Sequence, residues 1–96
     1  MQLTIIGVGK MGEALARGML HAEFVAPGEL VLADSAVERL GAVAGELDVR
    51  VTSDNALAAR DSDVVILAVK PALVAPVARE IAAALRPGAI VLSIAA

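Results

Sequence analysis

The chain has 96 residues, of which 58% are hydrophobic and one, Phe24, is aromatic. This length fits one domain with one core, and the high hydrophobic content excludes disorder as the default state. A net charge of −3 provides no basic face for nucleic acid, and the absence of cysteine excludes disulfides, thiolate catalysis and Cys-type zinc sites. The longest apolar run, 64–69, is too short for a membrane span of about 20 residues, and no basic leader precedes the first apolar segment. We therefore expect a cytoplasmic protein with no membrane or nucleic-acid partner.

The first third of the chain alternates a strand pattern with a helix pattern. Residues 3–6 are β-branched and apolar and predict a strand that ends at a glycine. Residues 10–22 carry apolar side chains at helical spacing and predict an amphipathic helix. Gly18 falls on its apolar stripe, and we expect it to let the helix lie close to the element beneath. After the break at Pro27-Gly28, residues 30–33 predict a second strand.

The middle of the chain repeats the alternation with shorter elements. Ser35 and Glu38 form an S-x-x-E capping box, which predicts that a helix opens there and continues to residue 47. Residues 49–51 predict a third strand. The cap residues 52–54 then predict a short helix that ends at Ala59.

The last third holds the most hydrophobic strand. Residues 64–69 are apolar at every position, as strands of a parallel sheet are when both faces are covered. A fourth helix follows Lys70-Pro71, and we expect Pro76 in its first turn, where a missing N–H is tolerated. Residues 89–94 predict a fifth strand. The alternation predicts an α/β fold: a Rossmann-like, doubly wound parallel sheet of five strands, in the order 3-2-1-4-5, with helices on both faces.

A glycine-rich turn joins the first strand to the first helix. Gly7, Gly9 and Gly12 form G-x-G-x-x-G within a strand–helix–strand unit, and Asp34 follows 22 positions later at the end of the second strand. In this context Gly7 permits the tight turn, Gly9 lets a pyrophosphate approach the backbone, and Gly12 lets the helix pack closely. Asp34 is positioned to accept hydrogen bonds from an adenosine ribose. Two alternatives remain: the glycines only make turns, or the ligand is another nucleotide-shaped molecule such as a methyl donor or a flavin.

Charged residues near this turn leave the choice between NADP and NAD open. Lys10 either reaches a phosphate or is solvated. An acid at Asp34 with no Arg directly after the strand disfavours the 2′-phosphate of NADP. Arg39, on the following helix, could compensate, but we expect it to be solvated.

Two further segments fall where strands of a parallel sheet end. Lys70-Pro71 follows the fourth strand and Asn55 follows the third, which favours site roles, with a helix cap as the alternative for Asn55. His21 lies late in the first helix, where exposure is expected. No set of catalytic residues and no metal site can be assembled, so the sequence predicts a cofactor platform without a catalytic centre.

The sequence resembles the N-terminal domain of pyrroline-5-carboxylate reductases over the whole chain, in order and spacing. The segments that carry the resemblance are residues 5–15 (IIGVGKMGEAL), 52–55 (TSDN), 63–71 (DVVILAVKP) and 93–96 (SIAA). The last two are more specific than the glycine motif. Deazaflavin-dependent NADP reductases contain the same type of domain and are the nearest alternative.

The resemblance implies an oxidoreductase that reduces 1-pyrroline-5-carboxylate to proline with NADPH or NADH, in proline biosynthesis. It implies that residues 1–96 form the dinucleotide-binding domain, and that a helical domain for substrate and dimer formation is absent from this chain. We therefore expect cofactor binding without activity, or, as a further alternative, a stand-alone nucleotide-binding module. The resemblance implies these cofactor-binding positions: Gly7, Val8, Gly9, Lys10, Met11 and Gly12 at the pyrophosphate; Asp34 and Ser35 at the ribose; and Asn55, Ala68, Val69, Lys70, Pro71 and Ala95 elsewhere along the cofactor. One departure is Lys10, where the family usually has Asn.

Overall fold

A computed structural model describes residues 1–94 and contains one five-stranded sheet. The strands lie in the order β3-β2-β1-β4-β5, and each neighbouring pair is parallel. Their bounds are β1 Leu3–Ile6, β2 Leu30–Ala33, β3 Arg50–Thr52, β4 Val64–Leu67 and β5 Ile90–Ser93. The predicted fold class and strand order are confirmed.

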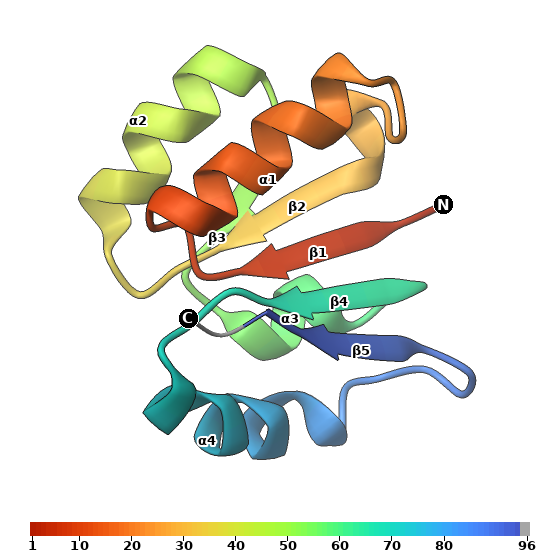
Figure 1. Ribbon diagram of the computed structural model, residues 1–96. Coiled ribbons are helices and arrows are strands. Elements are labelled where there is room, and N and C mark those ends of the chain that lie inside the picture. The colour runs from red at the N-terminus through yellow and green to blue at the C-terminus, as the bar shows by residue number, and fades with distance from the viewer. Residues whose placement is uncertain (95–96) are drawn as a thin grey trace.

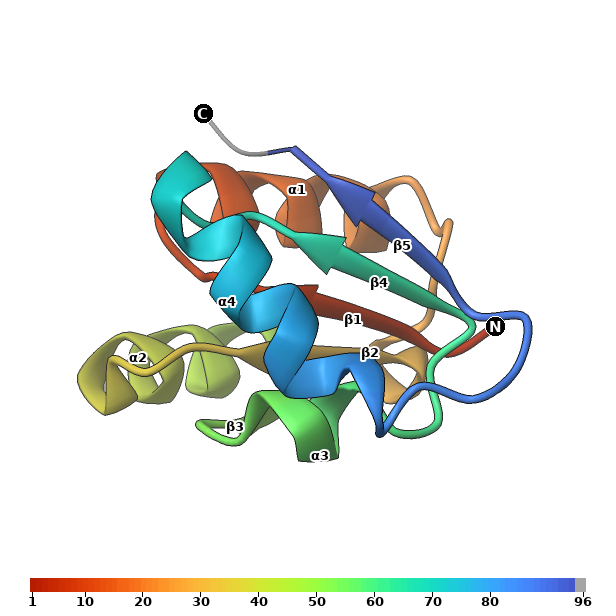
Figure 2. The ribbon, with the colours of Figure 1, turned by 90° about the horizontal axis from the view of Figure 1, so that it is seen from below.

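Helices cover both faces of this sheet. The helices are α1 Lys10–His21, α2 Val37–Leu47, α3 Asn55–Ala59 and α4 Pro71–Ala82, with a 3-10 turn, η1, at Pro27–Glu29. Figure 1 shows α1 and α2 on one side of the sheet and α3 and α4 on the other, and Figure 2 shows α4 crossing the second face. The crossover after β1 and the one after β4 therefore leave the sheet on opposite sides. This divergence opens a crevice at the carboxyl ends of β1 and β4, where ligands of doubly wound sheets bind.

The core has two layers because successive strand residues point to opposite faces. Leu3 and Ile5 of β1 pack with the residues beneath α1 and α2, whereas Ile6 packs with Ala59 and Ile81 beneath α3 and α4. Because helices cover both faces of the sheet, every residue of the central strand β1 is buried.

One buried polar contact ties β1 to α3. The Thr4 hydroxyl donates to the carbonyl oxygen of Ala58 at 2.7 Å and lies 2.6 Å from the Ser62 hydroxyl oxygen. Thr4 and Ser62 are both almost fully buried. The two hydroxyl groups satisfy each other's hydrogen-bonding capacity in a place that water does not reach. This part of the core therefore tolerates polar atoms.

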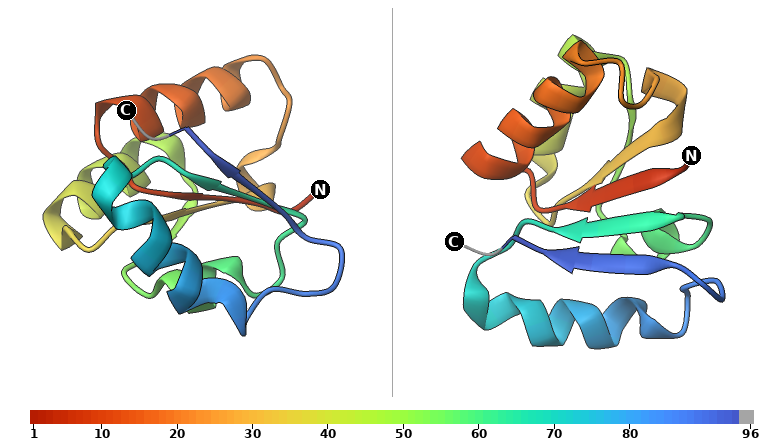
Figure 3. Two further views of the ribbon diagram at one scale, coloured as in Figure 1. Left: turned by 60° about the horizontal axis from the view of Figure 1, so that its bottom comes forward. Right: turned by 45° about the vertical axis from the view of Figure 1, so that its right-hand side comes forward.

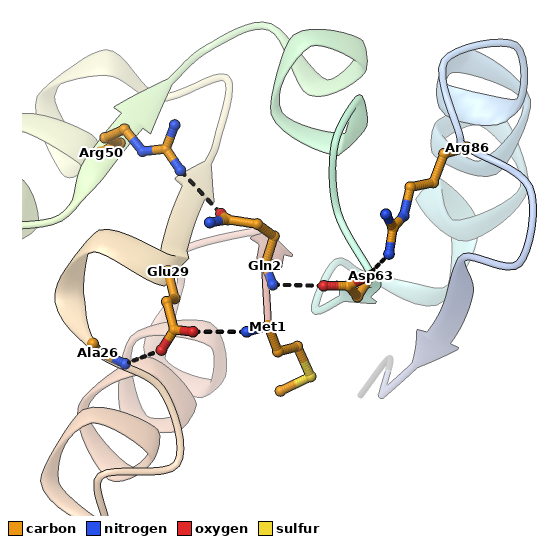
Figure 4. Close-up of polar contacts among 7 residues, drawn as sticks. All are labelled: Met1, Gln2, Ala26, Glu29, Arg50, Asp63 and Arg86. Atoms are coloured by element: carbon orange, nitrogen blue, oxygen red, sulfur yellow. Dashed lines mark hydrogen bonds and ion pairs between the residues drawn. The ribbon is translucent and has the colours of Figure 1, made fainter.

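Polar groups also join the amino ends of the strands, opposite the crevice (Figure 4). The Gln2 N–H donates to Asp63 at 2.8 Å, and Asp63 also pairs with Arg86. The amino group of Met1 pairs with Glu29 at 2.7 Å. This contact lowers the pKa of Glu29, with a smaller contribution from a backbone hydrogen bond.

The edge strand β5 is exposed along its whole length. Ile90 and Leu92 pair with Val64 and Ile66 of β4, so their side chains face the α1 and α2 side. The strand that α1 contacts most is β1, and the strand that α2 contacts most is β3. Figure 3 shows the edge of β5 clear of both helices, so an apolar strip, 90–92, stays open in the described part of the chain.

Three local predictions are wrong. α2 begins at Val37 after an uncapped Ala36 and not at a Ser35 capping box, because the Asp34 carboxylate accepts the Ala36 N–H and holds this segment in a turn. Pro76 lies inside α4 because the helix already begins at Pro71. Gly18 has no neighbouring atom within 4 Å of an added Cβ, so close packing does not require a glycine there.

Candidate cofactor site

Gly7 is the point where the carboxyl ends of three strands meet. Its φ of +101° is a conformation that side chains rarely adopt, and an added Cβ would lie 2.4 Å from the Ala68 carbonyl oxygen. The Gly7 N–H donates to Ala33 of β2 at 2.7 Å, and the Ala68 N–H donates to Ile6 of β1 at 2.8 Å. The backbone after β4 is therefore pressed against the turn after β1.

Gly12 is required for a different steric reason. An added Cβ would lie 1.8 Å from the Gly7 carbonyl oxygen, well inside any permitted contact. The first turn of α1 can approach the Gly7 turn only because residue 12 has no side chain. The predicted packing role of Gly12 is confirmed.

Gly9 is not required by the fold. Its φ of −76° is open to any residue, and an added Cβ would meet only the Arg39 guanidinium, at the ordinary contact distance of 3.6 Å. A methyl group at Gly9 would instead occupy open space in front of the N-terminus of α1. The glycine thus keeps clear a place where unpaired backbone N–H groups and a partial positive charge face outward, which suits a phosphate.

The Asp34 carboxylate is turned inward and is only 9% exposed. One oxygen accepts the Val8 N–H at 2.7 Å, and the other accepts the Ala36 N–H at 2.8 Å. Arg39 adds a longer contact of 3.4 Å to the first oxygen. Arg39 is exposed, as expected, and the acid that it contacts joins the glycine turn to the start of α2.

A cavity of about 380 Å³ opens at this edge of the sheet. Eight of the predicted residues line it: Gly7, Gly9, Asp34, Ser35, Asn55, Ala68, Val69 and Lys70. A second hollow of about 580 Å³ shares Gly9 and Arg39 with the cavity and adds Val8 and Lys10. Most of the predicted cofactor-binding residues thus gather around one continuous surface.

Three of the predicted residues within 1–94 do not line either hollow. Gly12 is buried behind the turn, Met11 is exposed on α1, and Pro71 begins α4. Ala95 lies outside the described residues, so its predicted place near the cofactor stays a prediction. His21 is exposed in the last turn of α1, as expected.

Asn55 lines the cavity without capping the helix that it begins. The cap of α3 is Asp54, whose carboxylate accepts the Leu57 N–H at 3.0 Å. The Asn55 side-chain amide instead donates to Glu80 of α4 at 2.6 Å, so the cap alternative for Asn55 is wrong. This contact joins α3 to α4 along one wall of the cavity.

Sequence reasoning missed part of the cavity wall. Leu73 and Val77 contribute from α4, and Ala36 contributes from the start of α2. The spacing of Leu73 and Val77 by four residues placed them on one helical face, but nothing in the sequence showed that this face turns to the crevice. Among residues 1–94 no cluster of His, Cys, Asp or Glu is arranged to hold a metal ion, and no helix is long and apolar enough to cross a membrane.

The strand order, the crevice at the divergence of β1 and β4, and the glycine turn define the class of the chain. It is a Rossmann-like α/β domain. Over residues 2–96 the chain matches the family described as NADP oxidoreductase, coenzyme F420-dependent, and it belongs to that family.

Pyrroline-5-carboxylate reductases are among the similar proteins, as the resemblance implied. The enzyme of Methanosarcina acetivorans is 37% identical over 95 residues, which cover 99% of this chain and 35% of that protein. The structure of the Coxiella burnetii reductase has a TM-score of 0.91 and 28% identity, covering 98% of this chain and 35% of the other. The Plasmodium falciparum reductase with NADP bound has a TM-score of 0.81 and 26% identity, with coverages of 98% and 33%. The chain therefore spans about a third of the length of these relatives.

Proposed function

We propose that the chain is the NAD(P)-binding domain of a pyrroline-5-carboxylate reductase. The observation that carries the proposal is Gly9, because the fold itself does not explain a glycine there and a dinucleotide pyrophosphate does. The bound NADP of the Plasmodium falciparum relative supports the same class of ligand.

Each part of the site has a role in this proposal. The turn from Gly7 to Gly12, including Val8, Lys10 and Met11, holds the pyrophosphate through backbone N–H groups at the start of α1. Ser35, with the Asp34 loop, lies at the adenosine ribose. Asn55 lines the cofactor from the wall of the cavity. The segment Ala68, Val69, Lys70 and Pro71, together with Ala95, lies toward the nicotinamide.

The reduced nicotinamide supplies a hydride, which in the complete reductase goes to the imine carbon of the pyrroline ring. The residues of this chain bind and orient that cofactor. The described residues provide no acid or base set for the substrate, so we propose that a helical domain beyond this chain completes the substrate site and forms the dimer. The exposed strip of β5, 90–92, supports such a covering domain, since apolar surface of this kind marks interfaces. We propose a cytoplasmic location for the whole protein.

Calorimetric titration of the chain with NADPH and with NADH tests the proposal. We expect binding of at least one reduced cofactor in the micromolar to low-millimolar range and no reduction of the pyrroline substrate by the chain alone. The Gly9→Ala variant should keep its stability to within about 1 kcal/mol, the usual cost of an Ala cap, and should bind at least tenfold more weakly. Full activity of the isolated chain would refute the need for a second domain, and equal binding by Gly9→Ala would refute the role of the glycine.

A second candidate function comes from the family description, which names coenzyme F420. In that case the complete protein would pass a hydride between NADP and a deazaflavin. Turnover assays of the complete protein with pyrroline-5-carboxylate and with reduced F420 as alternative substrates separate the two candidates.

A further inference from the structure

A separate cavity lies under α3 at the outer edge of the sheet. Its volume is about 320 Å³, and it shares no lining residue with the cofactor cavity or with the hollow beside that cavity. Its wall comes from β2, β3, α3 and the loop 60–62, together with Gln2. β3 is an edge strand, and α3 contacts both β2 and β3, so this space, the edge cavity, has the sheet on one side and α3 on the other.

Two cations of the edge cavity have no acidic partner. Three other arginines each pair with a carboxylate, namely Arg17, Arg39 and Arg86. Arg50 and Arg60 line the edge cavity, and among residues 1–94 neither has an acid within ion-pair distance. Arg50 donates instead to the neutral side chain of Gln2 at 3.1 Å (Figure 4). In a chain with more acids than bases, two guanidinium groups without a counter-charge in one small cavity indicate a place for an anion.

The rest of the lining indicates what else the ligand carries. Asp61 lines the same cavity, is exposed, and pairs with neither arginine. Its carboxylate repels a multiply charged anion such as phosphate and attracts an ammonium group. Val31 and Val51 are half-buried in the wall, and Leu57 is half-exposed there, which suits an aliphatic group. The edge cavity thus offers two cations, one anion and apolar surface.

We infer that the edge cavity binds a small aliphatic amino acid in its zwitterionic form. Arg50 and Arg60 hold the carboxylate, Asp61 holds the ammonium group, and the aliphatic part packs against Val31 and Leu57. A guanidinium binds a carboxylate through two parallel N–H donors, which adds both affinity and orientation. The volume agrees, because ligand pockets span roughly 300–1,000 Å³ and this cavity lies at the small end.

The first probe is L-proline, which has these charges and is the product of the proposed reaction; this choice of probe rests on the proposed function, whereas the site does not. Heteronuclear NMR of the isotope-labelled 96-residue chain shows which amides the ligand affects. We expect the amide signals of residues 50–52 and 57–62 to shift together, with a millimolar dissociation constant, while those of Gly7 and Gly9 stay in place. L-Prolinamide lacks the carboxylate and cyclopentanecarboxylate lacks the ring nitrogen, so each should bind at least fivefold more weakly.

Exposed side chains can be changed here without disturbing the core. Arg50→Gln and Arg60→Gln should each weaken L-proline binding at least threefold. Asp61→Asn should weaken L-proline to the same extent and leave cyclopentanecarboxylate binding undiminished. Arg79→Gln is the matched control, because Arg79 is also exposed and without an acidic partner among residues 1–94, but it lies on α4 and does not line the edge cavity. That variant should bind L-proline as the native chain does.

Several results would overturn the inference. These are the absence of shifts at 50–52 and 57–62, binding of either analogue as tight as that of L-proline, and a loss in Arg79→Gln equal to that in Arg50→Gln. Shifts at Gly7 and Gly9 in place of those at the edge cavity would also overturn it, since the amino acid would then bind at the cofactor site. Titration of the same chain with NADPH and NADH tests the proposed function separately, because the two sites share no residue.

Discussion

The Gly12→Ala substitution is expected to separate the first helix from the turn that it covers. The new methyl carbon would lie 1.8 Å from the Gly7 carbonyl oxygen and 2.9 Å from its carbon. Ordinary contact needs 3.4 Å or more, so backbone atoms must move apart by about 1.6 Å. The clash is with backbone, which no side-chain rotation relieves.

The expected cost follows from the place of this contact. Overpacking typically costs about 1–3 kcal/mol, and a backbone clash belongs at the upper end. The Gly7 turn cannot relax easily, because the Ala68 backbone packs directly against it and the Gly7 N–H donates to the Ala33 carbonyl oxygen. A loss of about 3 kcal/mol lowers the Tm of a domain of this size by about 12–24 °C.

Gly18→Ala is the matched control, because it makes the same change in the same helix. No atom lies within 4 Å of its added Cβ, so the helix should gain about 0.5–1 kcal/mol from the lower backbone entropy of Ala. Urea unfolding followed by far-UV circular dichroism measures both variants, since the chain has no Trp or Tyr. A Gly12→Ala variant within 0.5 kcal/mol of the native chain, or a Gly18→Ala variant that loses as much as Gly12→Ala, would refute the steric argument.

Two further predictions concern contacts away from the crevice. Thr4→Val removes a buried donor and leaves the Ala58 carbonyl with only its longer hydrogen bond of 3.3 Å from the Ser62 hydroxyl, so it should lower the free energy of unfolding by about 0.5–1.5 kcal/mol. Thr4→Ser should lose less, and equal losses would show that the hydroxyl does not matter. Because the Met1 amino group lowers the pKa of Glu29 below its ordinary 4.5, the stabilisation by Glu29 should be fully present above about pH 5 and disappear as pH falls through the lowered pKa. Between pH 2 and 7 the Tm difference between the native chain and Glu29→Gln should therefore shrink as pH falls below 4.5, with Glu38→Gln as the comparison, and a difference that persists at pH 2–3 would contradict this.

The order of strands and helices was predictable because each element carries its own periodicity. The run that begins at Val64 is apolar at every position, and the structure covers β4 on both faces except at its first residue, which is half-buried. The glycine motif was recognisable for a similar reason, since a strand, a turn and a helix surround it in order. Local pattern and global fold agree at these places.

The details that were missed depend on contacts between residues far apart in the chain. Ser35 and Glu38 have the spacing of a capping box, but the Asp34 carboxylate takes the Ala36 N–H and the helix starts later. The bond from Val8 to Asp34 spans 26 positions, and it turns the acid inward. No local pattern indicates this choice, so the pairing of Arg39 could not be expected from its neighbours in sequence.

The three glycines of the motif look alike in the sequence, but two of them are required by the fold and one is not. At Gly7 the φ angle is positive and an added Cβ would clash with neighbouring backbone. At Gly12 an added Cβ would clash, but the φ angle is not positive. Gly9 has neither, so a side chain there should disturb a ligand while leaving the fold intact. The hypothesis that all three only make turns predicts that no single substitution separates stability from binding. A Gly9→Ala variant that folds normally and fails to bind would exclude that hypothesis, because only a ligand in the open space would then explain the glycine.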